Sequence, residues 1–197
     1  MSNTRAIDST YAWLRLAACL GITTIGSAGM YLVVVALPAF QGDFGVGRAG
    51  AAMPYTMVMV GFGIGGIATG KLVDRYGVAL PMALSALALG LAFAGAAHAP
   101  SYWLFALLHV FIGWFGCAAV FGPLLADISK WFVKRRGLAV AIAASGNYVA
   151  GAAWPKPMVH MLEANGWRDT YSFMALVSVA TILPLVLVLR PVPERRS

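Results

Sequence analysis

The sequence predicts an all-α fold of the polytopic membrane class, with six transmembrane helices in one bundle. Two observations predict this fold: the composition, and the spacing of the charged residues. Of the 197 residues, 60% are hydrophobic and 11% are charged, whereas a soluble domain carries about 25% charged residues. A water-soluble fold of this size could not bury that much apolar surface. The lipid bilayer is therefore the first partner that the composition implies.

Long stretches without Asp, Glu, Lys or Arg define the expected spans, because a helix needs about 20 apolar residues to cross the hydrocarbon core. Four such stretches cover residues 16–42, 49–70, 137–155 and 170–189. A fifth stretch, 76–126, is long enough for two helices and is interrupted by His98-Ala99-Pro100-Ser101, a turn signal. We therefore expect spans at about 15–39, 50–70, 78–97, 102–126, 137–160 and 170–189, between an N-terminal segment 1–14 and a C-terminal tail 190–197.

The distribution of Lys and Arg among the loops predicts the orientation. If both termini share one side, that side carries Arg5, Arg15, Lys71, Arg75, Lys130, Lys134, Arg135, Arg136, Arg190, Arg195 and Arg196. The opposite side carries Arg48, Lys156 and Arg168. Because cytoplasmic loops are enriched in Lys and Arg, we expect cytoplasmic termini in a multi-pass protein of the plasma membrane, or of the inner membrane if the source is bacterial. Topology thus explains the net charge of +7, and nucleic acid is not expected as a partner.

The loop between the second and third spans carries a recognisable motif. It reads Gly70-Lys71-Leu72-Val73-Asp74-Arg75-Tyr76-Gly77. From the residues alone this is a tight turn, in which glycine permits the reversal and Asp74 and Arg75 cap or pair at helix ends. The string resembles the G-x-L-x-D-R-x-G signature of the major facilitator superfamily, at the place where that family carries it. The resemblance implies that Asp74 and Arg75 help to hold the cytoplasmic side closed against the other transporter half, although Val78 and Ala79 depart from the basic residues common after the signature.

A second signature lies between the fourth and fifth spans. It reads Trp131-Phe132-Val133-Lys134-Arg135-Arg136-Gly137-Leu138-Ala139, and the small residues Ala143-Ala144-Ser145-Gly146 follow. Physically this is a basic loop with aromatic anchors that leads into a helix suited to close packing in lipid. The string resembles the corresponding segment of the monocarboxylate transporter and oxalate/formate antiporter branch. A weaker likeness to the acidic-to-aromatic N-terminal motif of that branch lies at residues 8–13.

Polar side chains within the first and fourth spans are candidates for a translocation path, because unpartnered polar groups are costly in lipid. Thr24, Ser27 and Tyr31 share one helix face, and the resemblance implies that the first helix lines the central cavity. The alternative is that their hydroxyls bond to their own helix or a neighbour. The resemblance places His109 where some family members carry a functional arginine. It would exchange a proton or meet an anion, or else be a neutral histidine bonded to an adjacent helix.

Three further residues complete the candidate path. Asn147 and Tyr148 lie near the midplane of the fifth span and should face the protein interior or the cavity. Lys156, between Pro155 and Pro157, could meet an anionic substrate or could instead reach the outer headgroups.

Glycines in the second span are expected to serve packing. Gly61, Gly63 and Gly66 have the spacing of a dinucleotide fingerprint, but they lie inside an apolar span with no preceding strand. We expect instead that two pairs, Gly61 with Gly65 and Gly66 with Gly70, allow close helix contact.

The resemblance implies a secondary active transporter, and its branch implies small organic anions such as monocarboxylates as substrates. Such transporters build their site between two six-helix halves, and this sequence is similar to the N-terminal one. A second half, from another copy or a separate chain, is therefore an expected partner. The alternative is a truncated, non-transporting fragment or a membrane binding or regulatory subunit. No cofactor, metal or enzyme activity is expected: Ser145-Gly146 matches part of an intramembrane serine protease motif, but the last span has no histidine.

Overall fold

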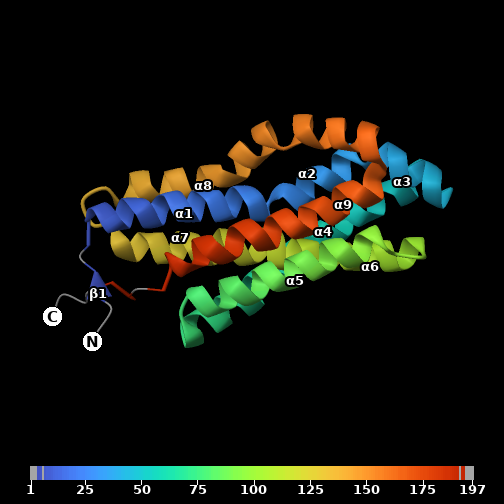
Figure 1. The fold of residues 1–197 in the computed structure, drawn as a ribbon. Coiled ribbons are helices and arrows are strands. Elements are labelled where there is room, and N and C mark those ends of the chain that lie inside the picture. The colour runs from blue at the N-terminus through green and yellow to red at the C-terminus, as the bar shows by residue number, and fades with distance from the viewer. Residues whose placement is uncertain (1–3, 6, 191, 194–197) are drawn as a thin grey trace.

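A computed structural model describes residues 4–5, 7–190 and 192–193, with side chains for residues 7–190. Long helices lie side by side and alternate in direction (Figure 1). Strands β1 (Thr4–Arg5) and β2 (Val192–Pro193) pair in parallel, so the two ends of the described chain meet at one end of the bundle. The expected basic residues Arg195 and Arg196 lie outside the described residues. The all-α membrane fold expected from the sequence is confirmed.

The first crossing consists of three helices in sequence: α1 (Thr10–Gly26), α2 (Ala28–Val35) and α3 (Leu37–Phe44). Ser9 caps α1 by accepting a hydrogen bond from the amide of Ala12 at 3.4 Å. The helices are separated at Ser27 and Ala36, both of which keep right-handed helical dihedrals. Gly45, with φ of 61°, ends the crossing in a left-handed conformation that favours glycine.

The second and third crossings are α4 (Arg48–Tyr76) and α5 (Ala79–Ala97). The expected loop at 71–77 is wrong in its extent, because α4 remains helical through Tyr76 and only Gly77 reverses the chain, with φ of 76°. Helix-forming residues such as Lys71, Leu72 and Arg75 extend α4 beyond its apolar part. The absence of charged residues therefore predicted the extent of the apolar segment, but not the residue at which the helix ends.

The fourth crossing contains a π-helical segment, η1 (Ile112–Ala118), between α6 (Tyr102–Phe111) and α7 (Ala119–Trp131). Ser101 caps α6 by accepting from the amide of Leu104 at 3.4 Å. A π segment inside an α-helix adds a residue to the turn and shifts the facing of the side chains that follow. It therefore sets which side chains of α7 face the interior.

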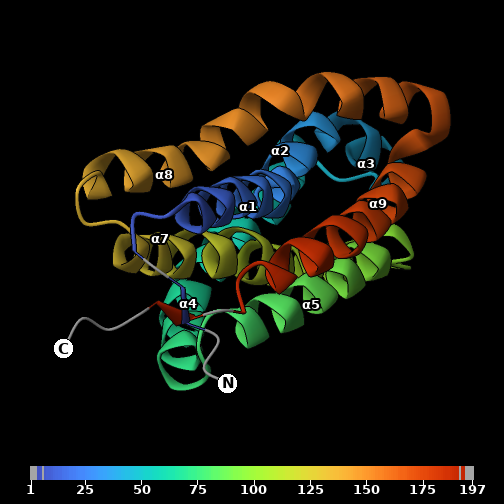
Figure 2. The same cartoon turned by 60° about the vertical axis from the view of Figure 1, so that its left-hand side comes forward.

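The fifth and sixth crossings are α8 (Arg136–Ala153) and α9 (Pro155–Leu187). Gly166, with φ of 82° and ψ of 171°, breaks α9, so residues 155–165 continue the fifth crossing and 167–187 form the sixth. Figure 2 shows this chain reversal at the end of the bundle away from the termini. Five helical segments of the described chain are long and apolar enough to span a membrane, and the longest, Arg136–Leu187, contains both of these crossings.

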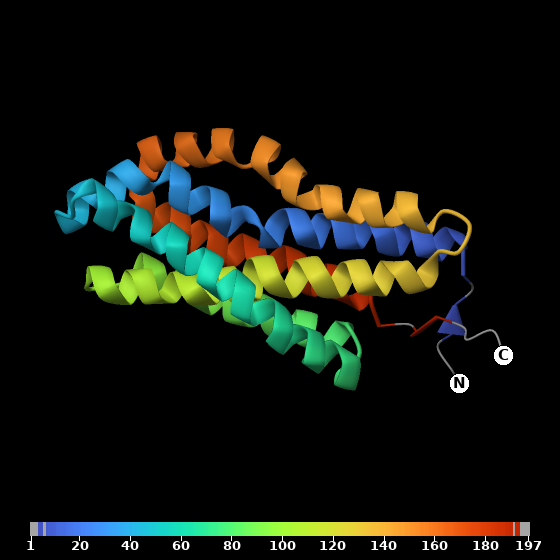
Figure 3. The same cartoon turned by 180° about the vertical axis from the view of Figure 1, so that it is seen from behind.

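Glycines allow the second and fourth crossings to approach closely. Seen from behind, α4 crosses the line of α6, η1 and α7 (Figure 3). A Cβ at Gly61 would overlap the carbonyl oxygen of Val110, and a Cβ at Gly113 would overlap that of Val58. Close backbone approach through small residues is how helices associate in lipid. The Gly61–Gly65 pair thus packs inside the bundle, whereas a Cβ added at Gly66 or Gly70 would meet no described atom within 4 Å, contrary to the expected second packing pair.

The two ends of the bundle differ in charge. We call the basic end the one formed by the start of α1, the turn at 77–78 and the loop 132–135; the far end carries the turns at 45–47 and 98–101 and Gly166. Lys71, Arg75, Lys130, Lys134, Arg135, Arg136 and Arg190 all belong to the basic end. At the far end, Arg168 pairs with Asp43 at 3.0 Å while both side chains remain about half exposed.

Candidate functional site

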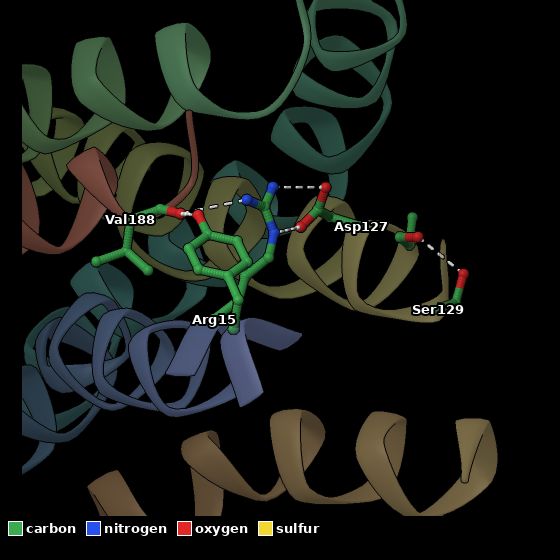
Figure 4. A network of polar contacts seen from close by, with 6 residues as sticks. Arg15, Asp127, Ser129 and Val188 are labelled. Atoms are coloured by element: carbon green, nitrogen blue, oxygen red, sulfur yellow. Dashed lines mark hydrogen bonds and ion pairs between the residues drawn. The ribbon is translucent and has the colours of Figure 1, made fainter. Parts of the chain in front are cut away.

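At the basic end, a buried ion pair joins the first crossing to the fourth. Arg15 Nε donates to Asp127 Oδ2 at 2.6 Å, and Arg15 Nη2 donates to Asp127 Oδ1 at 3.0 Å (Figure 4). The two side chains are 1% and 12% exposed. Two parallel hydrogen bonds between a guanidinium and a carboxylate fix the relative orientation of the two side chains and also strengthen their attraction. The pair therefore holds α1 and α7 in register.

Further contacts tie the end of the sixth crossing to the same pair. Arg15 Nη1 donates to the carbonyl oxygen of Val188 at 3.3 Å, and the Tyr11 hydroxyl donates to that oxygen as well (Figure 4). The guanidinium lies 4.7 Å from the centroid of the buried Trp131 ring. Arg15 was expected only as a loop cation that sets orientation, and no sequence signal pairs it with Asp127.

The two sequence segments that resemble the monocarboxylate branch contact each other. The Asp8 carboxylate accepts from the amides of Val133 and Lys134 at 3.2–3.4 Å, and the Asp8 amide donates to the Trp131 carbonyl. Trp13 packs edge-on against Phe132, with ring centroids 5.1 Å apart. We call this set the basic-end clasp: residues 8–15 held against residues 127–134.

The basic residues of the loop signature face outward from this clasp. Lys134, Arg135 and Arg136 are exposed, and Arg136 donates to the Ser129 hydroxyl at 3.2 Å. Trp131 and Phe132 are buried, so the aromatic anchor is internal to the protein rather than interfacial.

The Gly70–Gly77 motif lies on the last turns of α4. Leu72, Asp74 and Arg75 are exposed, and within residues 7–190 neither charged side chain forms an ion pair. Arg75 lies 5.3 Å from the ring centroid of Tyr76. Asp74 and Gly77 border a hollow that also reaches Arg15, Asp127 and Lys130. The side chains of Leu72, Asp74 and Arg75 are thus accessible on the surface at the basic end.

About midway along the crossings lies a second hollow, which we call the mid-bundle hollow. Its lining comes from four crossings: Ser27, Met30, Met59, Phe62, Cys117, Phe121 and Asn147. Its cavity volume is about 100 Å³. It brings together Ser27 and Asn147 from the candidate path, and its other lining residues were not singled out from the sequence.

Three other path residues bond to neighbouring helices or face outward. The Thr24 hydroxyl donates to the Leu20 carbonyl at 2.8 Å and lies 3.2 Å from the Gly146 carbonyl, as the alternative interpretation expected. The Tyr31 hydroxyl donates to the Asn147 carbonyl at 2.9 Å, which fixes α2 against α8 beside the hollow. Tyr148, by contrast, is 77% exposed and faces away from the bundle.

His109 lies on the side of the fourth crossing that faces the sixth. It is fully buried, with Nδ1 2.8 Å from the Phe105 carbonyl and Nε2 2.9 Å from the Tyr171 hydroxyl. Because a carbonyl only accepts, Nδ1 carries a hydrogen, and in the neutral ring Nε2 then accepts from the Tyr171 hydroxyl, so both nitrogens are bonded. The geometry matches the interpretation of a neutral histidine that joins two helices.

Lys156 lies exposed at the start of α9 and does not line the mid-bundle hollow. Its position beyond the Trp154 break places it toward the far end of the bundle.

Comparison with known proteins identifies relatives of this chain. The sequence profile of the Major Facilitator Superfamily matches residues 19–197. The Fujikurins efflux protein of Gibberella fujikuroi is 34% identical over 74% of this chain and 32% of its own length. The Riboflavin transporter RibJ of Trypanosoma cruzi is 30% identical over 67% of this chain and 28% of its own. Human Monocarboxylate transporter 11 is 33% identical over 46% and 22%. The matched region thus spans about a third or less of these relatives.

Proposed function

Since the chain belongs to the Major Facilitator Superfamily, we propose that it forms the N-terminal half of a secondary active transporter for a small organic solute. The observation that carries the proposal is the mid-bundle hollow, to which the first, second, fourth and fifth crossings all contribute. Transporters with this architecture place their substrate near the midplane, between two repeats. The hollow is one wall of such a site.

The second wall would come from another six-helix unit. The face of α4 leaves Val60, Ile64 and Ile67 between 43% and 69% exposed, and α8 leaves Leu138 and Tyr148 similarly exposed. Met59 and Phe62 of α4 and Asn147 of α8 line the hollow, and the Asp74–Arg75 motif lies at the basic end of α4. A partner covering α4 and α8 would therefore close the hollow and meet the motif.

We place the basic end in the cytoplasm, because membrane proteins concentrate Lys and Arg on that side. The protein would then be a multi-pass protein of the plasma membrane, or of the bacterial inner membrane in a prokaryote, with both termini inside.

A small organic anion, such as a monocarboxylate, remains the substrate that the sequence motifs favour. One relative is named a monocarboxylate transporter, whereas others are named for the efflux of fujikurins or for riboflavin. The described residues that line the mid-bundle hollow include no basic side chain, so a carboxylate would need a cation from the second half.

Site-specific photo-crosslinking tests the pairing. A photoreactive benzoylphenylalanine at Ile64 should capture a six-helix partner in native membranes, either a second copy or a separate chain. The matched control is the same residue at Leu91, which is 74% exposed on α5 and not on the proposed interface. Equal capture at both positions would contradict the assignment of the α4 face.

Transport itself is tested after pairing. The chain and its captured partner, reconstituted in proteoliposomes, should take up a labelled organic solute against its gradient when a proton gradient is imposed. A complex that forms but moves neither lactate nor larger aromatic solutes would favour the alternative, a non-transporting binding or regulatory subunit.

A further inference from the structure

We propose that the mid-bundle hollow receives a neutral aromatic group that carries an O–H or N–H donor, so that the solute is an amphipathic aromatic compound rather than a short aliphatic carboxylate. The proposal rests on the proposed function and names the substrate class of its site. Three properties of the described lining support it: its aromatic rings, the unpaired amide oxygen of Asn147, and its lack of charged side chains.

Aromatic and thioether side chains form the walls. Phe62 of α4 and Phe121 of α7 stand with ring centroids 6.4 Å apart at an interplanar angle of 63°. Met30 and Met59 complete the apolar lining. Edge-to-face aromatic pairs and methionine sulfur both favour contact with a further flat ring. A short aliphatic acid such as lactate presents no such surface, so these four side chains would contribute little to binding it.

Asn147 supplies an acceptor that lacks a donor. Its backbone carbonyl already accepts from the Tyr31 hydroxyl at 2.9 Å, which holds this turn of α8 in place. Its side-chain Oδ1 is buried and has no hydrogen-bond partner among the described residues. Buried amide oxygens are rarely left unpaired, because desolvating them without a partner is costly. Since Asn147 borders the hollow, a donor on a bound solute would satisfy this oxygen.

The described lining of the hollow offers nothing to compensate a negative charge. No Lys, Arg or His is among these residues. Arg15 is bonded to Asp127 at the basic end, and His109 is a neutral bridge to Tyr171. Moving a carboxylate from water into an apolar site without a paired cation is strongly unfavourable. Any charged group of the solute would therefore face the second six-helix half and not the mid-bundle hollow.

Binding to the full chain in lipid nanodiscs tests the proposal, with three probes measured by equilibrium dialysis against empty nanodiscs. The probe 4-hydroxybenzamide is neutral and carries donors, 4-methoxy-N,N-dimethylbenzamide keeps the ring without a donor, and lactate is the short carboxylate. We expect 4-hydroxybenzamide to bind at least tenfold more tightly than each of the others. Asn147→Leu should remove that tenfold preference over the donor-free ring, and Asn165→Leu, the same change at an exposed residue outside the hollow, should retain it.

A second variant, Phe62→Ala, tests the proposal independently in case Asn147→Leu does not fold. Phe62 is 38% exposed, so Phe62→Ala should fold, and it should weaken both aromatic probes severalfold without changing their ratio. Tighter binding of lactate than of 4-hydroxybenzamide, or an unchanged preference in a folded Asn147→Leu protein, overturns the proposal. Failure to pair or transport while this binding pattern persists would count against the proposed function and leave the assignment of the hollow intact.

Discussion

A bidentate ion pair inside an apolar bundle is sensitive to the loss of either member, because the survivor loses two charge-assisted hydrogen bonds at a buried position. Asp127→Asn leaves the Arg15 guanidinium, which is 1% exposed, in that position. We expect the variant to lose about 3–5 kcal/mol of unfolding free energy. Denaturation of the purified chain in mixed micelles measures the loss.

The far end supplies the matched control for this change. Asp43 also pairs with an arginine, but its side chain is 46% exposed, and exposed pairs contribute about 0–1 kcal/mol. Asp43→Asn should therefore have a small effect. Similar losses in the two variants would show that the Arg15–Asp127 pair is solvated in the membrane protein and would contradict its description as buried.

The bridge between His109 and Tyr171 predicts a second residue-scale effect. Tyr171→Phe removes the donor to Nε2 and leaves a buried acceptor unpaired, which we expect to lower the unfolding free energy by about 1–3 kcal/mol. Tyr148→Phe removes the same hydroxyl from a 77% exposed side chain and should change it by less than about 0.5 kcal/mol. Thermal unfolding of both variants in the same detergent gives the comparison.

For single residues, the sequence predicted where polar side chains lie better than it predicted which residues they bond to. Ser27 and Asn147 were expected near a cavity because unpaired polar groups are costly in lipid, and both line the hollow. The pairing of Arg15 with Asp127 was not predictable, because the residues are 112 positions apart and Arg15 was interpreted only as a cation that sets orientation. For His109, one of the two interpretations expected a bond to an adjacent helix, but the sequence did not indicate that Tyr171 supplies it.

Among the elements, the crossing of α4 with η1 depends on the absence of a side chain. Gly113→Ala would drive a Cβ into the Val58 carbonyl, and overpacking of this kind typically costs about 1–3 kcal/mol. Gly63→Ala on the same helix pair meets no described atom within 4 Å and should be neutral or slightly stabilising, since alanine favours a helix by up to about 1 kcal/mol. Unfolding temperatures of the two variants should therefore move in different directions, and a Gly113→Ala protein as stable as Gly63→Ala would contradict the close crossing.

Helix number was more predictable than helix shape. Uncharged stretches and one turn signal at 98–101 were enough to expect six crossings, because crossing length is set by the bilayer. The breaks at Ser27 and Trp154 and the π segment Ile112–Ala118 were missed. The break at Trp154 coincides with Pro155 at the start of α9, a local signal that the sequence carried and the prediction did not use. The break at Ser27 and the π segment have no counterpart in the local pattern of hydrophobicity.

For the whole molecule, the charge difference between the two ends predicts which residues face the cytoplasm. In a variant with Cys19 and Cys117 replaced by alanine, Val133→Cys at the basic end should be inaccessible to a membrane-impermeant thiol reagent in intact cells. Glu163→Cys near the far end should react under the same conditions, and both positions are exposed in the protein. Permeabilised cells provide the control, and labelling of Val133→Cys in intact cells would reverse the proposed orientation.

The basic-end clasp also has a consequence for the order of events during biosynthesis. The ribosome makes Arg15 112 residues before Asp127, which at about 5–20 residues per second is a delay of roughly 6–22 seconds. During that interval the first helix must hold its guanidinium at the membrane surface, which its position near the start of α1 allows. Docking of the first crossing in its final position therefore follows emergence of the fourth, and a chain stalled before residue 127 would hold Arg15 without its Asp127 partner.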